Sequence, residues 1–375
     1  MPQKNKDIEN PSAFKLWMND RVVNKIGKAI KAEYAAFDLK EFSKVSKELG
    51  PLELKARVLA ITAGLKKTLP PEYKKALNIL VKSMKTGDLS GFELWPVSEY
   101  ISQFGLDHFD ESLKAMYQLT QRFTAEFAVR PFLNKDHQKV LKTLDGWTED
   151  KSSHVRRWIS EGTRPLLPWG AKIHAFIKDP SHTVSFLEKL RHDEELYVRK
   201  SVANHLNDIS KHHPQVVVET LSKWLKDVPA EHQPKIDWIK RHALRTLIKK
   251  GHPGALKLMG VQGKAKVKVG ELKLSQKTYK LNDKLSFELA VTSTFAQKQK
   301  LVVDYAIDFI KANGKLGQKV YKLKTFEIGA KETVTLAKSH SLKPITTMKY
   351  YSGKHHVKIQ VNGEKIASGE FIFKV

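Results

Sequence analysis

Apolar residues recur every three or four positions along the first part of the chain. In residues 198–209, for example, Val198, Val202, Leu206 and Ile209 form one stripe of a helix. Short breaks that contain Gly or Pro separate such segments: LGP (49–51), LPPE (69–72), KDP (178–180) and HHP (212–214). The pattern predicts a region that is helical throughout.

The later half of this helical region repeats itself. The stretch HVRRWISEG at 154–162 returns as YVRKSVANH at 197–205 and, less closely, as WIKRHALRT at 238–246. The offsets of 43 and 41 residues match two-helix HEAT-type repeats. Such repeats stack into a curved solenoid, with the second helix of each pair on the concave side.

From residue 261 the pattern changes to alternation of polar and apolar residues with period two, which is typical of half-buried strands. The alternating stretches span 264–274, 284–293, 300–310, 331–337, 354–361 and 364–375. Asn313-Gly314 and Asn362-Gly363 lie between such stretches and predict hairpin turns. About seven short strands of this kind suggest an immunoglobulin-like sandwich.

The expected fold is therefore an α-helical HEAT-like repeat solenoid over residues 1–260, followed by an all-β immunoglobulin-like sandwich over residues 261–375. Composition changes at the same place. All seven Trp, every Arg and fourteen of the fifteen Pro precede residue 260, whereas 22 Lys and nine acidic residues give the last 115 residues a net charge of +13.

The whole chain carries a formal net charge of +26, which indicates a polyanionic partner. An anionic membrane surface is the rival partner, but the sequence has no apolar run long enough to span a bilayer and no signal-peptide pattern. The absence of Cys excludes disulfides, thiolate metal sites and Cys nucleophiles. We expect a cytoplasmic protein.

Basic pairs recur at one place in successive repeats, and such a stripe can follow a phosphate backbone. The pairs are Arg156-Arg157, Arg199-Lys200 and Lys240-Arg241.

Three carboxylates should share this surface. Glu126 lies four residues before Arg130, Glu161 lies three residues before Arg164, and Asp208 lies one turn after the position that matches Glu161 in the next repeat. Acids inside a basic groove repel DNA, so their presence suggests a ligand that is locally positive. The alternative is that they belong to solvated helix faces.

The segment from about 120 to 215, with EFAVRP, VRRWISEGTRPLLPW and VRKSVANHLNDISKHHP, resembles the AlkC subfamily of alkylpurine DNA glycosylases. The resemblance covers most of residues 1–260, and some members carry an immunoglobulin-like C-terminal extension. It implies excision of cationic N3-methylated bases (3-methyladenine and 3-methylcytosine) from duplex DNA, without flipping of the lesion and without a cofactor, as the first step of base-excision repair.

The residue chemistry fits such a reaction. A base methylated at N3 leaves as a neutral molecule and needs no general acid, so the remaining barrier is an oxocarbenium-like sugar that a carboxylate stabilises. We assign this role to Asp208, with Glu161 and Glu126 completing an anionic pocket. By the resemblance, Trp169 lies against the sugar or the lesion and supplies cation–π attraction; the alternative is a core Trp.

The resemblance also places Arg157 on the DNA backbone near the lesion. The related AlkD-type pocket uses a second Trp, for which Trp224 and Trp238 are the candidates, although core packing suits both. In the β region, a charge made entirely of Lys suits backbone contact, and the Asn362-Gly363 turn and the 294–300 loop should share one end of the sandwich. The expected DNA contacts are Arg156, Arg157, Arg164, Arg199, Lys200, Lys240, Arg241, Lys298, Lys300 and Lys365.

No His, Asp or Glu spacing builds a metal site, and no Lys is placed by a motif as a Schiff-base nucleophile. We therefore expect a monofunctional enzyme that acts as a monomer, with no metal, no obligate protein partner and no membrane. The rival functions are a non-catalytic HEAT module that binds damaged or distorted DNA, and a protein–protein adaptor. The density of Lys argues against the adaptor, because Lys is depleted from the cores of protein interfaces.

Overall fold

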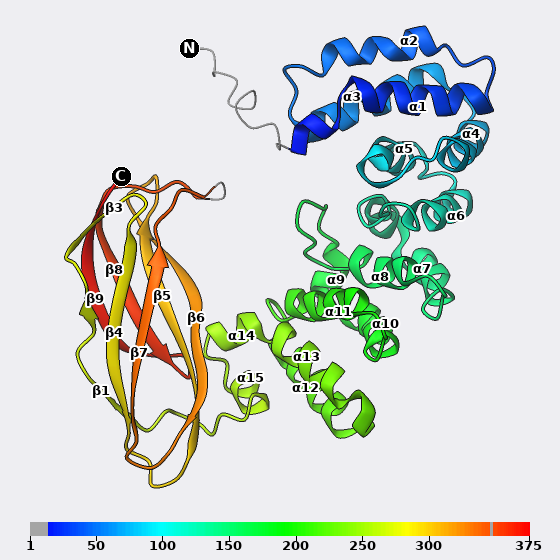
Figure 1. Ribbon diagram of the computed structural model, residues 1–375. Helices are drawn as coiled ribbons and strands as arrows, with labels where there is room; N and C mark the ends of the chain where they lie inside the picture. The colour runs from blue at the N-terminus through cyan, green and yellow to red at the C-terminus, as the bar shows by residue number, and fades with distance from the viewer. Residues whose placement is uncertain (1–13, 346–347) are drawn as a thin grey trace. The chain divides into compact units, whose positions relative to one another are not determined.

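The computed structural model describes residues 14–345 and 348–375 (Figure 1). Contacts within the chain divide it into two compact units. The first unit comprises Met1–Ile209 and Pro234–Ile239, and the second comprises Ser210–Gln233 and Lys240–Val375. Within the described ranges, no helix is both long and apolar enough to cross a membrane.

The first unit is a stack of helices, in which α1 packs on α4, α3 on α5, and α8 on α11 (Figure 1). Its α-helices are α1 (Asp20–Glu33), α2 (Leu39–Ser43), α3 (Leu54–Thr68), α4 (Tyr73–Thr86), α5 (Trp95–Phe104), α6 (Phe109–Thr120), α7 (Arg130–Asp145), α8 (Ser153–Gly162), α9 (His174–Lys178), α10 (Ser181–Leu190) and α11 (Leu196–Ile209). Three short 3₁₀ helices accompany them: η1 (Phe14–Trp17) before α1, η2 (Lys44–Glu48) between α2 and α3, and η3 (Gly91–Leu94) between α4 and α5. One continuous apolar core runs through the stack from Met18 to Phe186, and the predicted helical repeat region is confirmed.

The sequence repeat has a structural cause at the start of α8 and α11. Arg156, at the fourth position of α8, donates to the carbonyls of Asp150 (2.6 Å) and Lys151 (3.1 Å). Arg199, at the fourth position of α11, donates in the same way to the carbonyls of Asp193 (2.6 Å) and Glu194 (2.8 Å). Each Arg thus fixes the turn that leads into the second helix of its repeat.

The second unit combines helices with a β-sandwich. Its helices are α12 (Pro214–Lys226), η4 (Ala230–His232), α14 (Arg245–Lys249) and α15 (Pro253–Leu258), while α13 (Gln233–Ala243) has residues in both units. Its strands are β1 (Val267–Val269), β2 (Lys273–Leu274), β3 (Thr278–Lys280), β4 (Lys284–Ser293), β5 (Gln299–Ile310), β6 (Leu316–Ile328), β7 (Thr333–Ser341), β8 (Gly353–Val361) and β9 (Glu364–Lys374).

The strands form two sheets that pack face to face, which confirms the predicted sandwich. In one sheet the order is β1-β4-β2, with β7 also paired to β4, and in the other it is β3-β9-β8-β5-β6. All pairs are antiparallel except β3 with β9. Inward-facing rings such as Phe287, Tyr305 and Phe371 fill the core between the sheets.

Both Asn-Gly turns are hairpins, as predicted. Asn313-Gly314 connects β5 to β6, and Asn362-Gly363 connects β8 to β9. Asn362 and Gly363 both have positive φ, 49° and 82°, the conformation that a two-residue type I′ turn requires. The strands β3 and β6 were not among the stretches singled out from the sequence.

The helical segment before the sandwich packs directly on it. Leu256 and Val261 are buried together with Val302 of β5. Asn362 is 7% exposed. Its backbone N–H donates to the carbonyl of Val302 (2.8 Å), and its side-chain oxygen accepts a hydrogen bond from the N–H of Val302 (2.9 Å). At this junction Gly363 lies so close to Gly251 that a Cβ on Gly363 would be 2.1 Å from the Gly251 Cα atom. The boundary expected at residue 260 remains a prediction, but residues 248–261 belong to the second unit by their contacts.

Gly363→Ala should therefore destabilise the second unit more than Gly314→Ala. Both residues have positive φ, 82° and 73°, so either substitution strains the backbone by about 1–3 kcal/mol. A Cβ at Gly314 meets nothing within 4 Å. At Gly363 it collides with Gly251, and overpacking of this kind adds about 1–3 kcal/mol. The free energy of unfolding of each variant is measured by urea unfolding, with amide hydrogen exchange in β8 and β9 as the probe. Equal losses of stability in the two variants would show that the contact between Gly251 and Gly363 relaxes freely around the new Cβ.

Candidate functional site

The three predicted carboxylates meet around two arginines in the first unit. Arg157 donates to Glu126, and its Nη2 atom lies 3.6 Å from Oε1 of Glu161. Arg164 donates through Nη1 to Oε1 of Glu161 (2.6 Å) and through Nε to Oδ2 of Asp208 (2.8 Å). We call these five residues the carboxylate cluster. Opposite charges alternate along it from Glu126 to Asp208.

Helix geometry explains half of this arrangement. Arg157 and Glu161 lie four residues apart in α8, and Arg164, three residues after Glu161, lies just beyond the C-terminal end of this helix, so the three side chains are neighbours. Glu126 comes from the connection between α6 and α7, where the Thr124 hydroxyl donates to its carboxylate (2.7 Å). Asp208 comes from the last turn of α11, in the next repeat.

Two polar contacts set the register of α11 against α8. The hydroxyl of Ser201 donates to Oε2 of Glu161 (2.7 Å), so both carboxylate oxygens of Glu161 are held by protein groups. One turn later, Nδ1 of His205 lies 2.9 Å from the Ser160 carbonyl, and its Nε2 lies 3.1 Å from the Thr183 hydroxyl. Complete burial lowers the pKa of His205 to about 3, so this ring is neutral at pH 7 and acts as a fixed spacer.

An aromatic cavity of about 370 Å³ opens beside the carboxylate cluster. Glu126, Glu161 and Arg164 line it together with rings that include Phe92, Trp95, Phe123, Phe127 and Trp169. Asp208 does not line this cavity. It is 1% exposed and is bonded to Arg164, which does line the cavity.

The charge of the site is smaller than the acids alone suggested. Three carboxylates and two guanidiniums leave the carboxylate cluster at −1, and the buried Arg130 beside it balances even that. What distinguishes the site is the fixed position of each carboxylate, because each is bonded to an arginine.

Trp169 is 93% exposed, which rules out the core Trp that was its alternative. It lies in the connection between α8 and α9 and has a φ of +64°, a strained value for an indole-bearing residue. Of the two candidates for a second Trp, Trp224 is fully buried and Trp238 is half-buried. Trp95, at the start of α5, lines the aromatic cavity with Trp169 instead.

Arg130 holds the connection that carries Trp169. It is 1% exposed and donates to the carbonyls of Gly162 (3.0 Å), Arg164 (2.9 Å) and Ala171, which lie on either side of Trp169 in the chain. Burial, and then the nearby Arg164, lower the pKa of Arg130 to about 10, so it remains charged at pH 7. A Cβ at residue 170 would come within 3.0 Å of the Arg130 side chain, which explains Gly170.

Nothing in the sequence distinguished Arg130 beyond its place in EFAVRP. Arg130→Lys should accelerate amide hydrogen exchange in residues 163–171 by roughly tenfold or more, because a charge-assisted bond contributes about 1.5–3 kcal/mol. Arg57→Lys is the matched control, since Arg57 is also buried and donates to the carbonyls of Leu52 (2.8 Å), Met18 (3.0 Å) and Gly50 (3.2 Å). If both variants changed the rate of amide hydrogen exchange in residues 163–171 equally, Arg130 would not specifically stabilise that connection.

Several expected DNA contacts bond other protein groups. Arg156 and Arg199 fix the starts of their helices and Arg164 is buried in the carboxylate cluster, so the basic stripe is interrupted at these positions. Arg157 is half-buried, with its guanidinium 5.1 Å from the ring centre of Tyr197. The exposed members of the set are Lys200, Arg241, Lys298 and Lys365, whereas Lys240 and Lys300 are half-buried. Lys298 forms an ion pair with Glu327 (2.5 Å).

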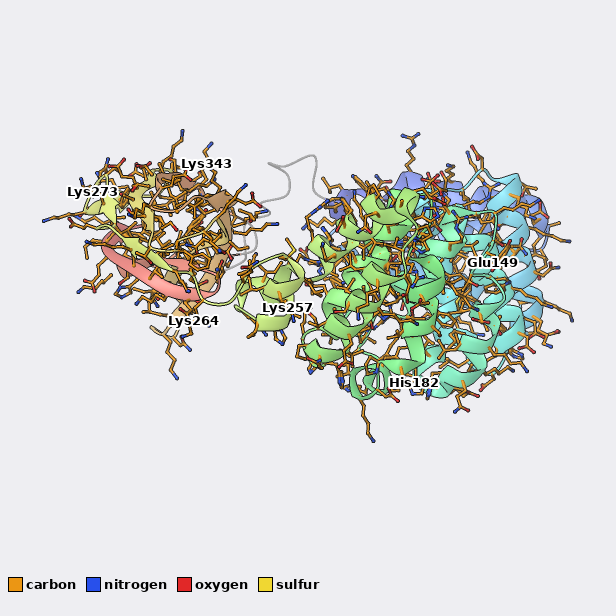
Figure 2. All side chains as sticks on the ribbon, turned by 90° about the horizontal axis from the view of Figure 1, so that it is seen from below. Glu149, His182, Lys257, Lys264, Lys273 and Lys343 are labelled. Carbon is orange, nitrogen blue, oxygen red and sulfur yellow. The ribbon has the colours of Figure 1, made fainter. Side chains whose placement is uncertain are left out.

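The Asn362-Gly363 turn and the start of β5 do share one end of the sandwich, as expected. The close approach of Gly251, however, covers the turn itself. Other lysines, such as Lys273 and Lys343, project from the surface of the β-sandwich (Figure 2). In the part of the chain that the structure describes, no three His, Asp or Glu side chains are grouped to hold a metal ion.

Comparisons with known proteins cover both the helical part and the sandwich of the chain. A model of the DNA alkylation repair enzyme family matches residues 122–247, and a model of the C-terminal Ig-like domain of the uncharacterised protein YhaZ matches residues 268–375. Uncharacterized protein YhaZ of Bacillus subtilis (strain 168) is 40% identical over 356 residues, which cover 94% of this chain and 97% of that protein.

A solved structure is similar over the same extent. Pseudomonas fluorescens alkylpurine DNA glycosylase AlkC, bound to DNA that contains an abasic site analogue, is 38% identical with a TM-score of 0.89, over 97% of this chain and 100% of that one. The chain therefore belongs to the family of DNA alkylation repair enzymes, among the members that carry a YhaZ-type Ig-like domain at the C-terminus.

Proposed function

We propose that the protein is a monofunctional DNA glycosylase that hydrolyses the N-glycosidic bond of cationic N3-alkylated bases, 3-methyladenine and 3-methylcytosine, in duplex DNA. The observation that carries the proposal is the carboxylate cluster, fixed by two arginines beside the exposed Trp169, in a chain of the DNA alkylation repair family. The similarity to a glycosylase bound to abasic DNA supports it further.

The reaction needs little from the protein besides electrostatics. The bond between C1′ and the base nitrogen breaks, and its electron pair neutralises the positive charge that methylation gave the base. Positive charge then develops on C1′ and O4′, and a water oxygen completes the substitution at C1′. Fixed negative charges beside the sugar stabilise this state, because they need no reorganisation when the charge appears.

Each part of the site has a place in this scheme. Glu126 and Glu161 line the aromatic cavity and would face the sugar or accept the proton of the attacking water, and Asp208 adds a desolvated negative charge through its bond to Arg164. The exposed indole of Trp169 would lie against the lesion and attract its charge. Because Trp169 would contact the lesion without entering the stacked bases of the duplex, the base need not be flipped.

Release of free base from methylated DNA tests the proposal. The protein is incubated with duplex DNA treated with a methylating agent, and free 3-methyladenine and 3-methylcytosine are separated by chromatography. Both bases should appear in proportion to the protein added. A protein that binds the methylated duplex but releases no base would instead be a non-catalytic module for damaged DNA.

We propose duplex DNA as the partner of the second unit also. The last 115 residues carry +13, and exposed lysines such as Lys298 and Lys365 suit contact with phosphates without base readout. The protein would act as a monomer in the cytoplasm.

A further inference from the structure

A basic hollow of about 720 Å³ lies on the first unit. None of its lining residues belongs to the carboxylate cluster or lines the aromatic cavity. Its cations are Lys85 from the last turn of α4, Lys114 from α6, and Arg122 from the turn that follows α6. The amides of Gln118 and Gln121 complete its polar lining. We call this set the basic hollow.

The charge of the basic hollow is not neutralised by the protein. No Asp or Glu is among its lining residues, and no hydrogen bond or ion pair joins the side chain of Lys85 or Lys114 to another described residue. Arg122 lies 3.8 Å from Asp88, whose side chain is 97% exposed, and a pair of that kind contributes little. Three cations, with no carboxylate among the lining residues, suit an anionic ligand.

The wall of the basic hollow is rigid. Tyr117 and Trp147 line it with ring centres 5.0 Å apart, and Trp147 also stacks on Trp158 at 5.7 Å. The Tyr117 hydroxyl donates to Asp150 (2.7 Å), so this nearby carboxylate already has a partner. A ligand would therefore meet a surface that is already ordered, which lowers the entropic cost of binding.

Consecutive residues connect the basic hollow to the aromatic cavity. Arg122 lines the hollow, Phe123 lines the cavity, and Thr124 donates to Glu126 of the carboxylate cluster. A DNA strand advances by about 3.4 Å per nucleotide, so a strand that leaves the cavity reaches the hollow within a few phosphates.

We propose that the basic hollow binds the phosphodiester backbone of DNA next to the lesion. The proposal rests on the proposed function only for the position of the lesion, because phosphate binding itself requires no damage. Lys and Arg contact phosphates without reading the sequence, so this site should add affinity that is equal for all sequences and sensitive to salt.

The test compares two triple variants with the same reduction in charge. One replaces the cations of the basic hollow (Lys85→Gln, Lys114→Gln, Arg122→Gln), and the other replaces exposed lysines elsewhere on the first unit (Lys28→Gln, Lys142→Gln, Lys178→Gln). Binding to an undamaged, fluorescently labelled duplex is measured by anisotropy over about 50–200 mM salt.

The log–log slope of affinity against salt should become shallower in the first variant by about 0.9 for each phosphate that is no longer neutralised, and its affinity should fall more than that of the control. Equal slopes in the two variants would overturn the proposal, because the effect would then come from net charge alone. Arg122→Lys, which keeps the charge, should retain the wild-type slope, and Lys114→Gln alone should make the slope shallower by about 0.9. Since the duplex is undamaged, the result does not depend on whether the protein releases bases.

Discussion

Asp208→Asn should lower the rate of base release by about 10²–10³ while duplex binding stays intact or becomes slightly tighter. Asp208 is 1% exposed and bonded to Arg164, so its negative charge acts at low dielectric next to a residue that lines the aromatic cavity. Asn has the same shape but no charge, so the stabilisation of the developing cation disappears while the packing remains. Single-turnover excision of 3-methyladenine under saturating protein measures the rate.

Asp308→Asn is the control, because Asp308 is also buried (4% exposed) and forms an ion pair with Lys358 (2.5 Å), but lies in the sandwich of the second unit. It should leave the excision rate near that of the wild type. If Asp208→Asn released 3-methyladenine as fast as the unmodified protein, Asp208 would only be a structural partner of Arg164, and the catalytic charge would have to come from Glu126 and Glu161.

The protein should release cationic bases far faster than neutral ones such as uracil or hypoxanthine. A neutral base must gain a proton as it leaves, and a positioned general acid typically contributes about 10²–10⁴ to such a step. Among the described residues that line the aromatic cavity there is no Lys or His. Arg164, which does line it, is a guanidinium paired with two carboxylates and does not serve as an acid at neutral pH.

Matched duplexes that carry one 3-methyladenine, one hypoxanthine or one uracil at the same position allow a direct comparison of single-turnover rates. The first should be cleaved at least about 10² faster than either of the others. Comparable release of uracil at neutral pH would show that a proton donor reaches the base and that the electrostatic mechanism is incomplete.

Local signals in the sequence predicted much of the fold. The positive φ of Asn362 and Gly363 follows from the Asn-Gly dipeptide itself, and the periodicity around Val198 follows from burial of one helix face. Strand β6 was not singled out because its residues are exposed or half-buried apart from Ile328, and Lys319, Lys322 and Lys324 leave it without a marked apolar face. It is the second strand of the Asn313-Gly314 hairpin, and its pairing with β5 decides its structure.

The candidate site could likewise be predicted only where it depends on local sequence. The spacing of Arg157, Glu161 and Arg164 is a local helix property, and the repeat offset placed Asp208 close to them. The burial of Arg164 and the contacts of Arg130 with both sides of Trp169 depend on helices that pack from elsewhere in the chain. The repeat of Arg156 and Arg199 is visible in the sequence, but it does not show whether an arginine contacts backbone carbonyls or DNA, so both resembled a DNA-binding stripe although both fix helix starts.

The close approach of Gly251 to Gly363 bears on how the two parts of this chain can be exchanged in evolution. The family models match residues 122–247 and 268–375, and the segment between them, which neither model matches, supplies the buried contacts of Leu256 and Val261 with the sandwich. An ancestral sandwich acquired by gene fusion at residue 261 would have lacked its partner surface. The sandwich together with the short helices that precede it is therefore the part that could be exchanged as a unit, and recombination within residues 248–261 would separate two surfaces that are buried against each other.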